Sequence, residues 1–302
     1  MTRRFSRLTF PYIIWMLVFT IVPLLLVAFF AFTAYDQEGN LFFTWQGFNN
    51  IFSGSKTSLN WLGLHTIWGL DIQVPLYISV FLKSLSIAVV ATIISLLFGY
   101  PVAWLLAKLK IAKKRSADFL LFLTVMPMWM NALLRTYAWL ALLEPTGIIN
   151  TFLKTLGIGP IQFLYNDFGI GLGMVYNYLP FMILPIYSVL VKIDPALLEA
   201  AGDLGADNTY TLRKVIIPLS LPGVYSGINM VLMPAMTTFL IPDLLGGGRY
   251  LLIGNAIQRQ YMISRDYTTG SALTILLLIF VLISMSVVNR NSTEMSEAGG
   301  LI

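Results

Sequence analysis

The sequence contains no cysteine, one histidine and few charged residues, and each shortage excludes a class of protein. Without cysteine the chain cannot form disulfides, bind a metal through thiolates or use a thiol nucleophile. His65 alone cannot build a multi-histidine metal centre, so we expect an ordinary loop residue and no metal site. Only 11% of the 302 residues are charged, whereas 57% are hydrophobic. No soluble domain could bury so much apolar surface, so the composition predicts a polytopic membrane protein, and the fold class that we expect is an all-α membrane protein.

The net charge of +5 raises the question of a nucleic-acid partner. The lysines and arginines do not form one basic surface in the sequence; they flank the apolar runs. That placement is typical of the cytoplasmic face of a membrane protein, where they meet membrane lipid. We therefore expect no nucleic-acid partner.

Six apolar runs have about the length that a helix needs to cross the hydrocarbon core. The first follows Arg3, Arg4 and Arg7. A cleaved signal peptide is the competing interpretation of this run, but it is longer than a typical signal core and no clear A-x-A site follows it. We expect one domain over residues 1–302 with spans at about 10–32, 84–106, 119–143, 168–191, 219–241 and 270–288.

The positive-inside rule gives an orientation for these spans. With a cytoplasmic N-terminus, twelve of the 19 lysine and arginine residues lie on the cytoplasmic side. Five of them are clustered between residues 108 and 115. We therefore expect both termini and the polar segment 194–218 to be cytoplasmic.

Segment 194–218 is polar but has the signals of ordered helices. Asp194 and Pro195 form a helix start, since proline at an early helical position loses no hydrogen bond. Gly205 is expected to break this helix, and Asp207 or Asn208 to cap a second one that stops at Pro218.

The same segment contains a spaced motif. It reads EAA at Glu199, Ala200 and Ala201, then Gly205 after three residues, and Val215, Ile217 and Pro218 after nine more. This pattern resembles the EAA loop of permease subunits in ATP-binding-cassette (ABC) importers, with Val215 where that family usually has isoleucine. The resemblance implies a type I importer fold and a coupling helix that docks on an ATPase. It assigns ATPase coupling to Glu199, Ala200, Ala201, Gly205 and Pro218. The alternative is an ordinary amphipathic hairpin that packs on its own bundle.

Over roughly residues 80–270 the chain also resembles permeases of the PotB type, from spermidine/putrescine importers. The segments that carry this likeness include PMWMNALLRTYAWL, YLPFMILPIYSVL and PAMTTFLIPDLLGGG. The resemblance implies a multi-pass protein of the bacterial cytoplasmic membrane. It also implies a second permease subunit (PotC type), an ATPase dimer (PotA type) that binds ATP and magnesium, and an extracytoplasmic polyamine-binding protein (PotD type).

Two alternatives stay open at this stage. One is an ABC permease for another small solute. The other is a stand-alone secondary transporter, which would need internal repeats and paired intramembrane acids that the sequence does not show. In each case no bond chemistry is expected of this chain, and we expect it to hold no cofactor.

A polyamine pathway needs carboxylates for the ammonium groups and aromatic rings for the methylenes and for cation–π contact. Residues of these types lie at the expected outer ends of the spans, where the rings are equally explained as interfacial anchors. Asp243 is the strongest candidate, because it follows the fifth span directly. The full set is Asp243, Glu144, Asp167, Trp129, Tyr137, Tyr176 and Tyr178.

Arg135 lies within the third expected span, where a charge is costly, so it should face protein or water. Asn131, Arg135 and Trp139 share one helix face by their four-residue spacing. We interpret Arg135 and Asn131 as structural, with Arg135 paired to Glu144 or to a backbone carbonyl. A pathway wall or a subunit anchor is the alternative. After the fifth span, residues 251–263 are expected to form an interfacial amphipathic helix or a plain outer loop.

Overall fold

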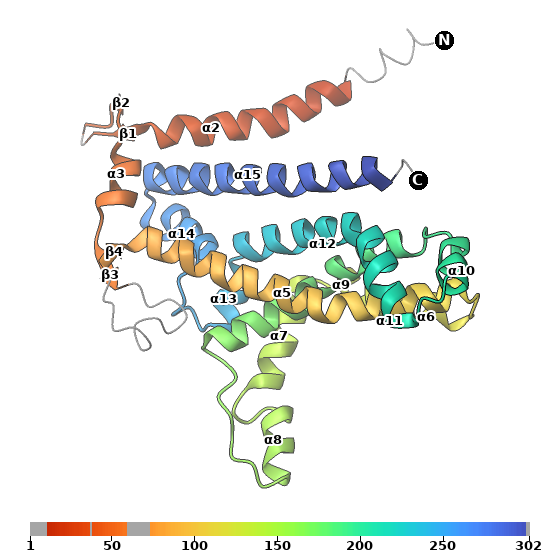
Figure 1. Cartoon of the computed structure of the whole chain (residues 1–302). Helices are drawn as coiled ribbons and strands as arrows, with labels where there is room; N and C mark the ends of the chain where they lie inside the picture. Colours follow the sequence, from red (N-terminus) through yellow and green to blue (C-terminus); the bar gives the residue numbers. More distant parts are fainter. Residues whose placement is uncertain (1–10, 37, 59–72, 300–302) are drawn as a thin grey trace. The chain divides into compact units, whose positions relative to one another are not determined.

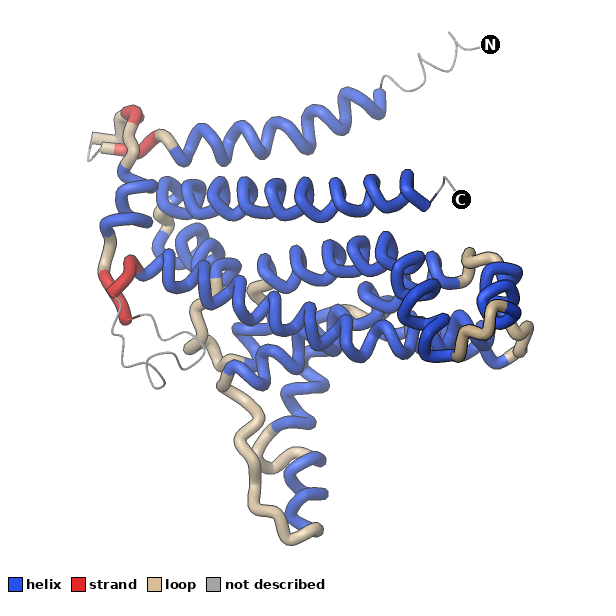
Figure 2. Tube along the Cα trace, in the orientation of Figure 1, coloured by secondary structure: helices blue, strands red, loops and turns tan. Residues whose placement is uncertain are grey.

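The computed structural model describes residues 11–36, 38–58 and 73–299. Arg3, Arg4, Arg7 and His65 lie outside these residues. The described chain is mainly helical (Figures 1 and 2). Within the described residues, five helices are long and apolar enough to cross a membrane: Pro11–Ala31, Leu76–Ile111, Asp167–Leu190, Asn208–Thr237 and Tyr267–Val288. A bent pair of helices between residues 116 and 155 supplies a sixth crossing if it counts as one span. The expectation of six transmembrane helices is consistent with this set.

The chain divides into two compact units. The first is Met1–Leu82 with Ala256–Phe280, and the second is Lys83–Asn255 with Val281–Ile302. Within the first unit, η1 (Leu17–Ile21) and α2 (Val22–Ala31) belong to the first span. A hairpin of β1 (Thr33–Tyr35) and β2 (Leu41–Phe43) follows, and α3 (Gln46–Ser53) comes after it.

Aromatic packing holds this hairpin, because Phe32 contacts Trp45, Phe48 and Phe43 at ring distances of 5.0 to 5.9 Å. A second antiparallel pair, β3 (Lys56–Ser58) and β4 (Gln73–Pro75), leads into α5 (Leu76–Ile111). Helix α3 lies against the start of α15 (Tyr267–Gly299). A Cβ on Gly47 would meet the carbonyl oxygen of Thr268 at 2.7 Å, so only glycine permits this approach.

The second unit is built around α9 (Asp167–Leu190) and α12 (Ile217–Thr237). Its core contains Met182, Ile183 and Ile186 from α9. Glycines on α12 let the two backbones approach: a Cβ on Gly223 would meet Pro185 O at 2.8 Å, and one on Gly227 would meet Met182 Sδ at 2.7 Å. Close contact through small residues is how membrane helices gain packing energy without a hydrophobic driving force between them.

The segment expected as the third span is broken. Helix α6 (Ser116–Val125) and η2 (Met126–Trp129) are followed by α7 (Ala132–Leu143) and α8 (Ile148–Thr155), with a bend of 97° after Trp129. Met130 adopts an extended conformation with ψ 145°, and the Asn131 side chain accepts a 2.8 Å hydrogen bond from Leu133 N. Asn131 is therefore the N-cap of a new helix and not a mid-span residue, which corrects the shared-face interpretation.

Two other boundaries differ from expectation. The fifth span ends at Thr237, because Thr238 is extended and α13 (Leu240–Leu245) starts a separate helix. The segment expected as a helix or loop at 251–263 contains α14 (Ile253–Arg259) and η4 (Gln260–Ser264). The expectation of a helix lying at the interface is wrong for its first half, since Leu252, Ile253, Asn255 and Ala256 are at most 2% exposed.

Candidate coupling and substrate sites

The segment with the EAA pattern begins with a capped helix, as the sequence predicted. Helix α10 (Pro195–Asp203) starts at Asp194, whose Oδ1 accepts a 2.9 Å hydrogen bond from Ala196 N. Pro195 occupies the first turn, where its missing N–H loses no hydrogen bond.

Gly205 ends α10 in a left-handed conformation with φ +80°. Gly205 N donates to Gly202 O at 2.9 Å, and Ala206 N donates to Ala201 O at 3.0 Å. This pair of bonds is a Schellman motif, in which the residue at Gly205 must accept a positive φ. Asp207 Oδ1 then accepts from Tyr210 N at 2.7 Å and caps α11 (Asn208–Thr211). The break and the second cap are confirmed.

The expected stop at Pro218 is wrong. Residues 208–237 run as one helix, in which η3 (Leu212–Ile216) is a wide π turn between α11 and α12. Ile217 N donates to Leu212 O, five residues back. Because proline clashes with the carbonyl four residues before it in an ordinary α-helix, the wide turn before Pro218 lets the helix pass it without ending.

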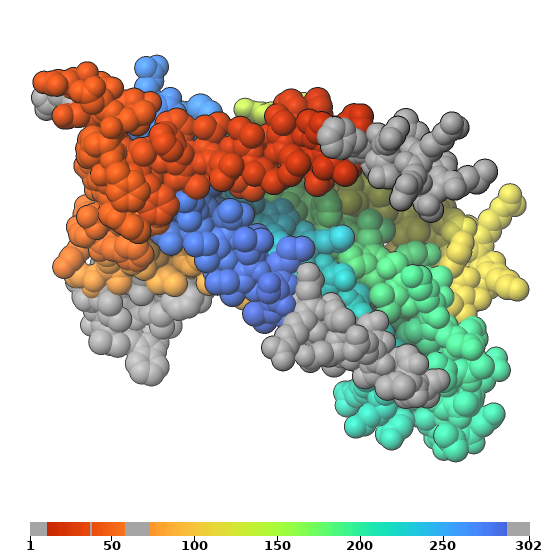
Figure 3. Space-filling view, turned by 90° about the horizontal axis from the view of Figure 1, so that it is seen from above, coloured from red at the N-terminus to blue at the C-terminus, as the bar shows by residue number. Residues whose placement is uncertain are grey.

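The loop presents the charged Glu199 together with small and apolar side chains to solvent. Glu199 and Ala200 are exposed, and Leu204 is 89% exposed beside the Gly205 turn. A Cβ on Gly202 or on Gly205 would meet no atom within 4 Å, so there is open space beside both glycines. Figure 3 shows the loop (green) at the surface.

Behind the loop lies a cavity of about 460 Å³. It is bordered by the end of α5, the end of α9, and both helices of the loop, with Lys108 Nζ 5.6 Å from the Trp104 ring centre. The loop therefore leaves space between itself and the spans.

Arg135 fastens the broken span to α9. It is 7% exposed, its Nε donates to Asn177 Oδ1 at 2.7 Å, and its Nη1 donates to Pro127 O on the other side of the break. The structure thus shows the expected backbone carbonyl as a partner of Arg135, together with the Asn177 side chain, which was not expected. Glu144, the other partner considered, is exposed at the end of α7.

The contacts that the structure shows for the pathway candidates are with different partners. Asp243 Oδ1 accepts a hydrogen bond from the buried Asn255 amide, which also donates to Phe239 O at 2.8 Å. The Tyr176 ring lies 4.9 Å from the Trp139 ring, and Tyr178 Oη donates to Pro234 O at 3.3 Å. The candidates that are exposed are Trp129, Tyr137, Glu144 and Asp167. The two cavities described here are lined by none of the seven.

Asp167 has partners that the sequence did not indicate. Its Oδ1 lies 3.3 Å from Lys83 Nζ, and Lys83 Nζ lies 4.3 Å from the Tyr250 ring centre. The pKa of the Tyr250 hydroxyl is raised, mainly because the group is partly buried and also because Asp167 is negatively charged. The hydroxyl therefore stays neutral. No sequence signal links these residues, because they are more than 80 positions apart and carry no motif.

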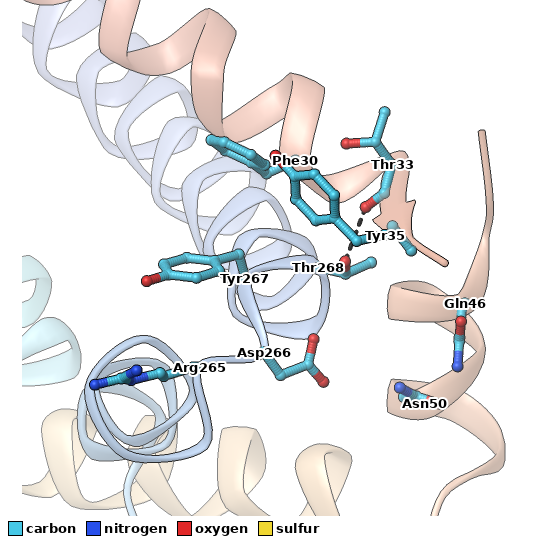
Figure 4. A pocket seen from close by; sticks show the side chains of 10 residues that line it. Phe30, Thr33, Tyr35, Gln46, Asn50, Arg265, Asp266, Tyr267 and Thr268 are labelled. Atoms are coloured by element: carbon cyan, nitrogen blue, oxygen red, sulfur yellow. Dashed lines mark hydrogen bonds between the residues drawn. The ribbon is translucent and has the colours of Figure 1, made fainter. Parts of the chain in front are cut away.

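A second cavity, of about 290 Å³, lies within the first unit and was also not expected. Figure 4 shows the Phe30, Tyr35 and Tyr267 rings and the Asp266 carboxylate around it, with the Arg265 side chain directed away. Thr268 Oγ1 donates to Thr33 O at 2.8 Å at its edge. Among the residues that the structure describes, no group of three or more His, Asp or Glu could hold a metal ion.

The chain matches a known family of transport proteins and is similar to two permeases of named function. Residues 99–296 match the family described as the inner membrane component of binding-protein-dependent transport systems. The Haemophilus influenzae spermidine/putrescine transport system permease protein PotB is 40% identical over 92% of this chain and 93% of its own length. Escherichia coli PotB is 42% identical over 74% of this chain and 81% of its own length.

The fold has counterparts among solved structures. A bacterial ABC transporter that imports alginate matches with a TM-score of 0.70 and 19% identity, over 96% of this chain and 95% of that chain. The type I importer permease fold that the EAA pattern implied is therefore confirmed, as is a multi-pass location in the bacterial inner membrane. The chain belongs to the family of inner-membrane permease components of binding-protein-dependent ABC transport systems.

Proposed function

We propose that this chain is a permease subunit of an ATP-driven importer of polyamines, with spermidine and putrescine as the substrates to test first. The observation that carries this proposal is 40% identity, over 92% of the chain, to a permease of that named function. The chain has the role of a non-catalytic membrane subunit.

The proposed assembly has four kinds of partner around this chain. These are a second permease subunit of the PotC type, an ATPase dimer of the PotA type, an extracytoplasmic binding protein of the PotD type, and membrane lipid. ATP and magnesium belong to the ATPase. The positive-inside distribution supports a cytoplasmic position for both termini and for segment 194–218.

The coupling loop has the features that docking requires. Glu199, Ala200 and Ala201 lie on a helix with an open face, and the turn at Gly205 holds Leu204 out in solvent. A groove on the ATPase that closes on this surface would bury apolar area at a fixed point. Because α11, η3 and α12 are continuous, movement of the loop is transmitted into the span. The transport cycle is alternating access, driven by ATP binding and reset by hydrolysis.

The test is uptake of radiolabelled spermidine and putrescine in bacteria that lack their own importers. The chain is expressed with its companion subunits, or the companions are expressed alone. We expect saturable uptake only when the chain is present, and loss of uptake with Glu199→Ala despite normal membrane insertion. Equal uptake with and without the chain would contradict the polyamine assignment, as would competition by an unrelated solute but not by unlabelled polyamine.

A further inference from the structure

The ammonium group of Lys83 sits in a small cage within the second unit. Lys83 Nζ lies 3.3 Å from Asp167 Oδ1 and 4.3 Å above the Tyr250 ring centre. A carboxylate on one side and an aromatic face on the other is the arrangement that binds alkylammonium ions. The three residues come from α5, from the first turn of α9 and from the segment before α14.

The cage is part of a packed frame. The buried Ser84 Oγ, next to Lys83, accepts a 2.7 Å hydrogen bond from Ile253 N and so fixes α5 to the segment that carries Tyr250. Tyr165 N donates to Leu245 O at 2.8 Å, and this bond holds the residues just before α9 against the end of α13. The leucine side chains in these connected segments are almost fully buried: Leu164, Leu245 and Leu252. Asp167 and Tyr250 are therefore positioned by the frame and not by Lys83 alone.

Lys83 itself is held weakly. Its side chain is 34% exposed and that of Asp167 is 60% exposed, so water screens the ion pair and is available to solvate a displaced ammonium group. A lysine side chain is four methylenes ending in an ammonium group, which is the chemistry of one end of putrescine. The cage thus already holds a covalently tethered equivalent of the proposed substrate.

We propose that Asp167 and Tyr250 form a subsite for a terminal ammonium group of the substrate, and that Lys83 occupies this subsite as a tethered competitor until substrate displaces it. This inference rests on the proposed polyamine function. The other role for the same geometry is a structural clamp between α5 and α9. The two roles predict different changes in the KM of uptake when the Lys83 charge is removed. A subsite predicts a lower KM, whereas a clamp predicts a higher KM or less assembled complex.

The experiment measures KM and maximal rate of putrescine uptake by the complete transporter, with the amount of assembled complex determined for each variant. Lys83→Met keeps the length and packing of the side chain and removes the charge. We expect it to lower KM by about two- to fivefold, because a screened ion pair of this exposure competes only modestly. Asp167→Asn and Tyr250→Leu should raise KM. Lys83→Met combined with Asp167→Asn should keep the high KM.

Lys154→Met is the matched control, because Lys154 is an exposed lysine on α8 that contributes to neither the cage nor the coupling loop. It should leave KM unchanged. Butylamine, which reproduces the free lysine side chain, should inhibit putrescine uptake more strongly in Lys83→Met than in the unmodified complex.

A structural clamp gives a different result: Lys83→Met and Asp167→Asn then both reduce assembled complex or both raise KM. That pattern, or an unchanged KM in both, overturns the subsite. If the unmodified complex takes up no polyamine, the proposed function is wrong and the subsite is wrong with it. If the unmodified complex takes up polyamine but the variants give the clamp pattern, only the subsite is wrong.

Discussion

Arg135 Nε donates a 2.7 Å hydrogen bond to Asn177 Oδ1, and this contact joins α7 to the core helix α9. With the bond from Nη1 to Pro127 O, one side chain fastens both sides of a 97° bend. Replacing Arg135 with methionine would leave the buried Asn177 oxygen and the partly buried Pro127 carbonyl without these donors. We expect a loss of about 2 to 4 kcal/mol in unfolding free energy, measured by thermal or SDS denaturation of the purified complex.

Arg249→Met provides the comparison for that variant, because it removes an exposed arginine of the same unit. It should change stability by less than about 0.5 kcal/mol. If both variants were equally stable, Arg135 would have no structural role at the break.

A second prediction concerns the turn at Gly205. Its φ of +80° strains any residue with a Cβ by about 1 to 2 kcal/mol, although the space around it is open. We expect Gly205→Ala to reduce uptake and to increase protease cleavage of the loop, and Gly205→Asn to be milder because asparagine tolerates this conformation.

Gly202→Ala, three residues earlier, is the matched change at a helical position of α10 with open space around it. It should stabilise helix α10 by about 0.5 to 1 kcal/mol, because alanine favours a helix more than glycine does. Protease cleavage of the loop should therefore decrease. Equal cleavage of the Gly205→Ala and Gly202→Ala chains would show that the left-handed turn is unimportant.

Leu204 gives a prediction about docking. A leucine that is 89% exposed buries little surface in the fold, but its burial in a partner is worth about 1.5 to 3 kcal/mol. Leu204→Asp should therefore weaken binding of the ATPase to the membrane subunits by about tenfold or more, measured by titration in detergent, without loss of membrane insertion. Leu156→Asp, at an exposed leucine outside the loop, should have no such effect. Normal ATPase binding by Leu204→Asp would place the contact elsewhere.

Asp243 gives the fourth prediction. Asp243→Asn keeps an oxygen for the Asn255 amide but removes the negative charge. If the charge receives substrate, KM for polyamine uptake should rise about tenfold while assembly is unchanged. Unchanged uptake kinetics would limit Asp243 to its structural contact with Asn255.

Local features were predictable from the sequence, and contacts between distant segments were not. The caps at Asp194 and Asp207 and the turn at Gly205 depend on residues within one or two helical turns, so residue type and spacing suffice. The cage around Lys83 joins positions 83, 167 and 250, which only the packed core brings together.

The wrong expectations also have local causes. Pro218 has the usual signature of a helix stop, but the π turn before it relieves the clash, and nothing in the sequence indicated that turn. The apolar run at 119–143 predicts one span, because the length of an apolar run does not reveal the break after Trp129. Pro127 and Asn131 were signals that could have located it.

The unbroken helix from Asn208 to Thr237 has a consequence for how force travels through the chain. Its 30 residues correspond to a rod of about 45 Å, at about 1.5 Å per residue. One end carries the turn beside Leu204, and the other stops two residues before α13, the short helix that holds Asp243. At Gly223 and Gly227 the rod lies against α9 with almost no clearance, so these glycines act as a fulcrum. A tilt imposed at one end would thus appear, reversed in direction, at the other.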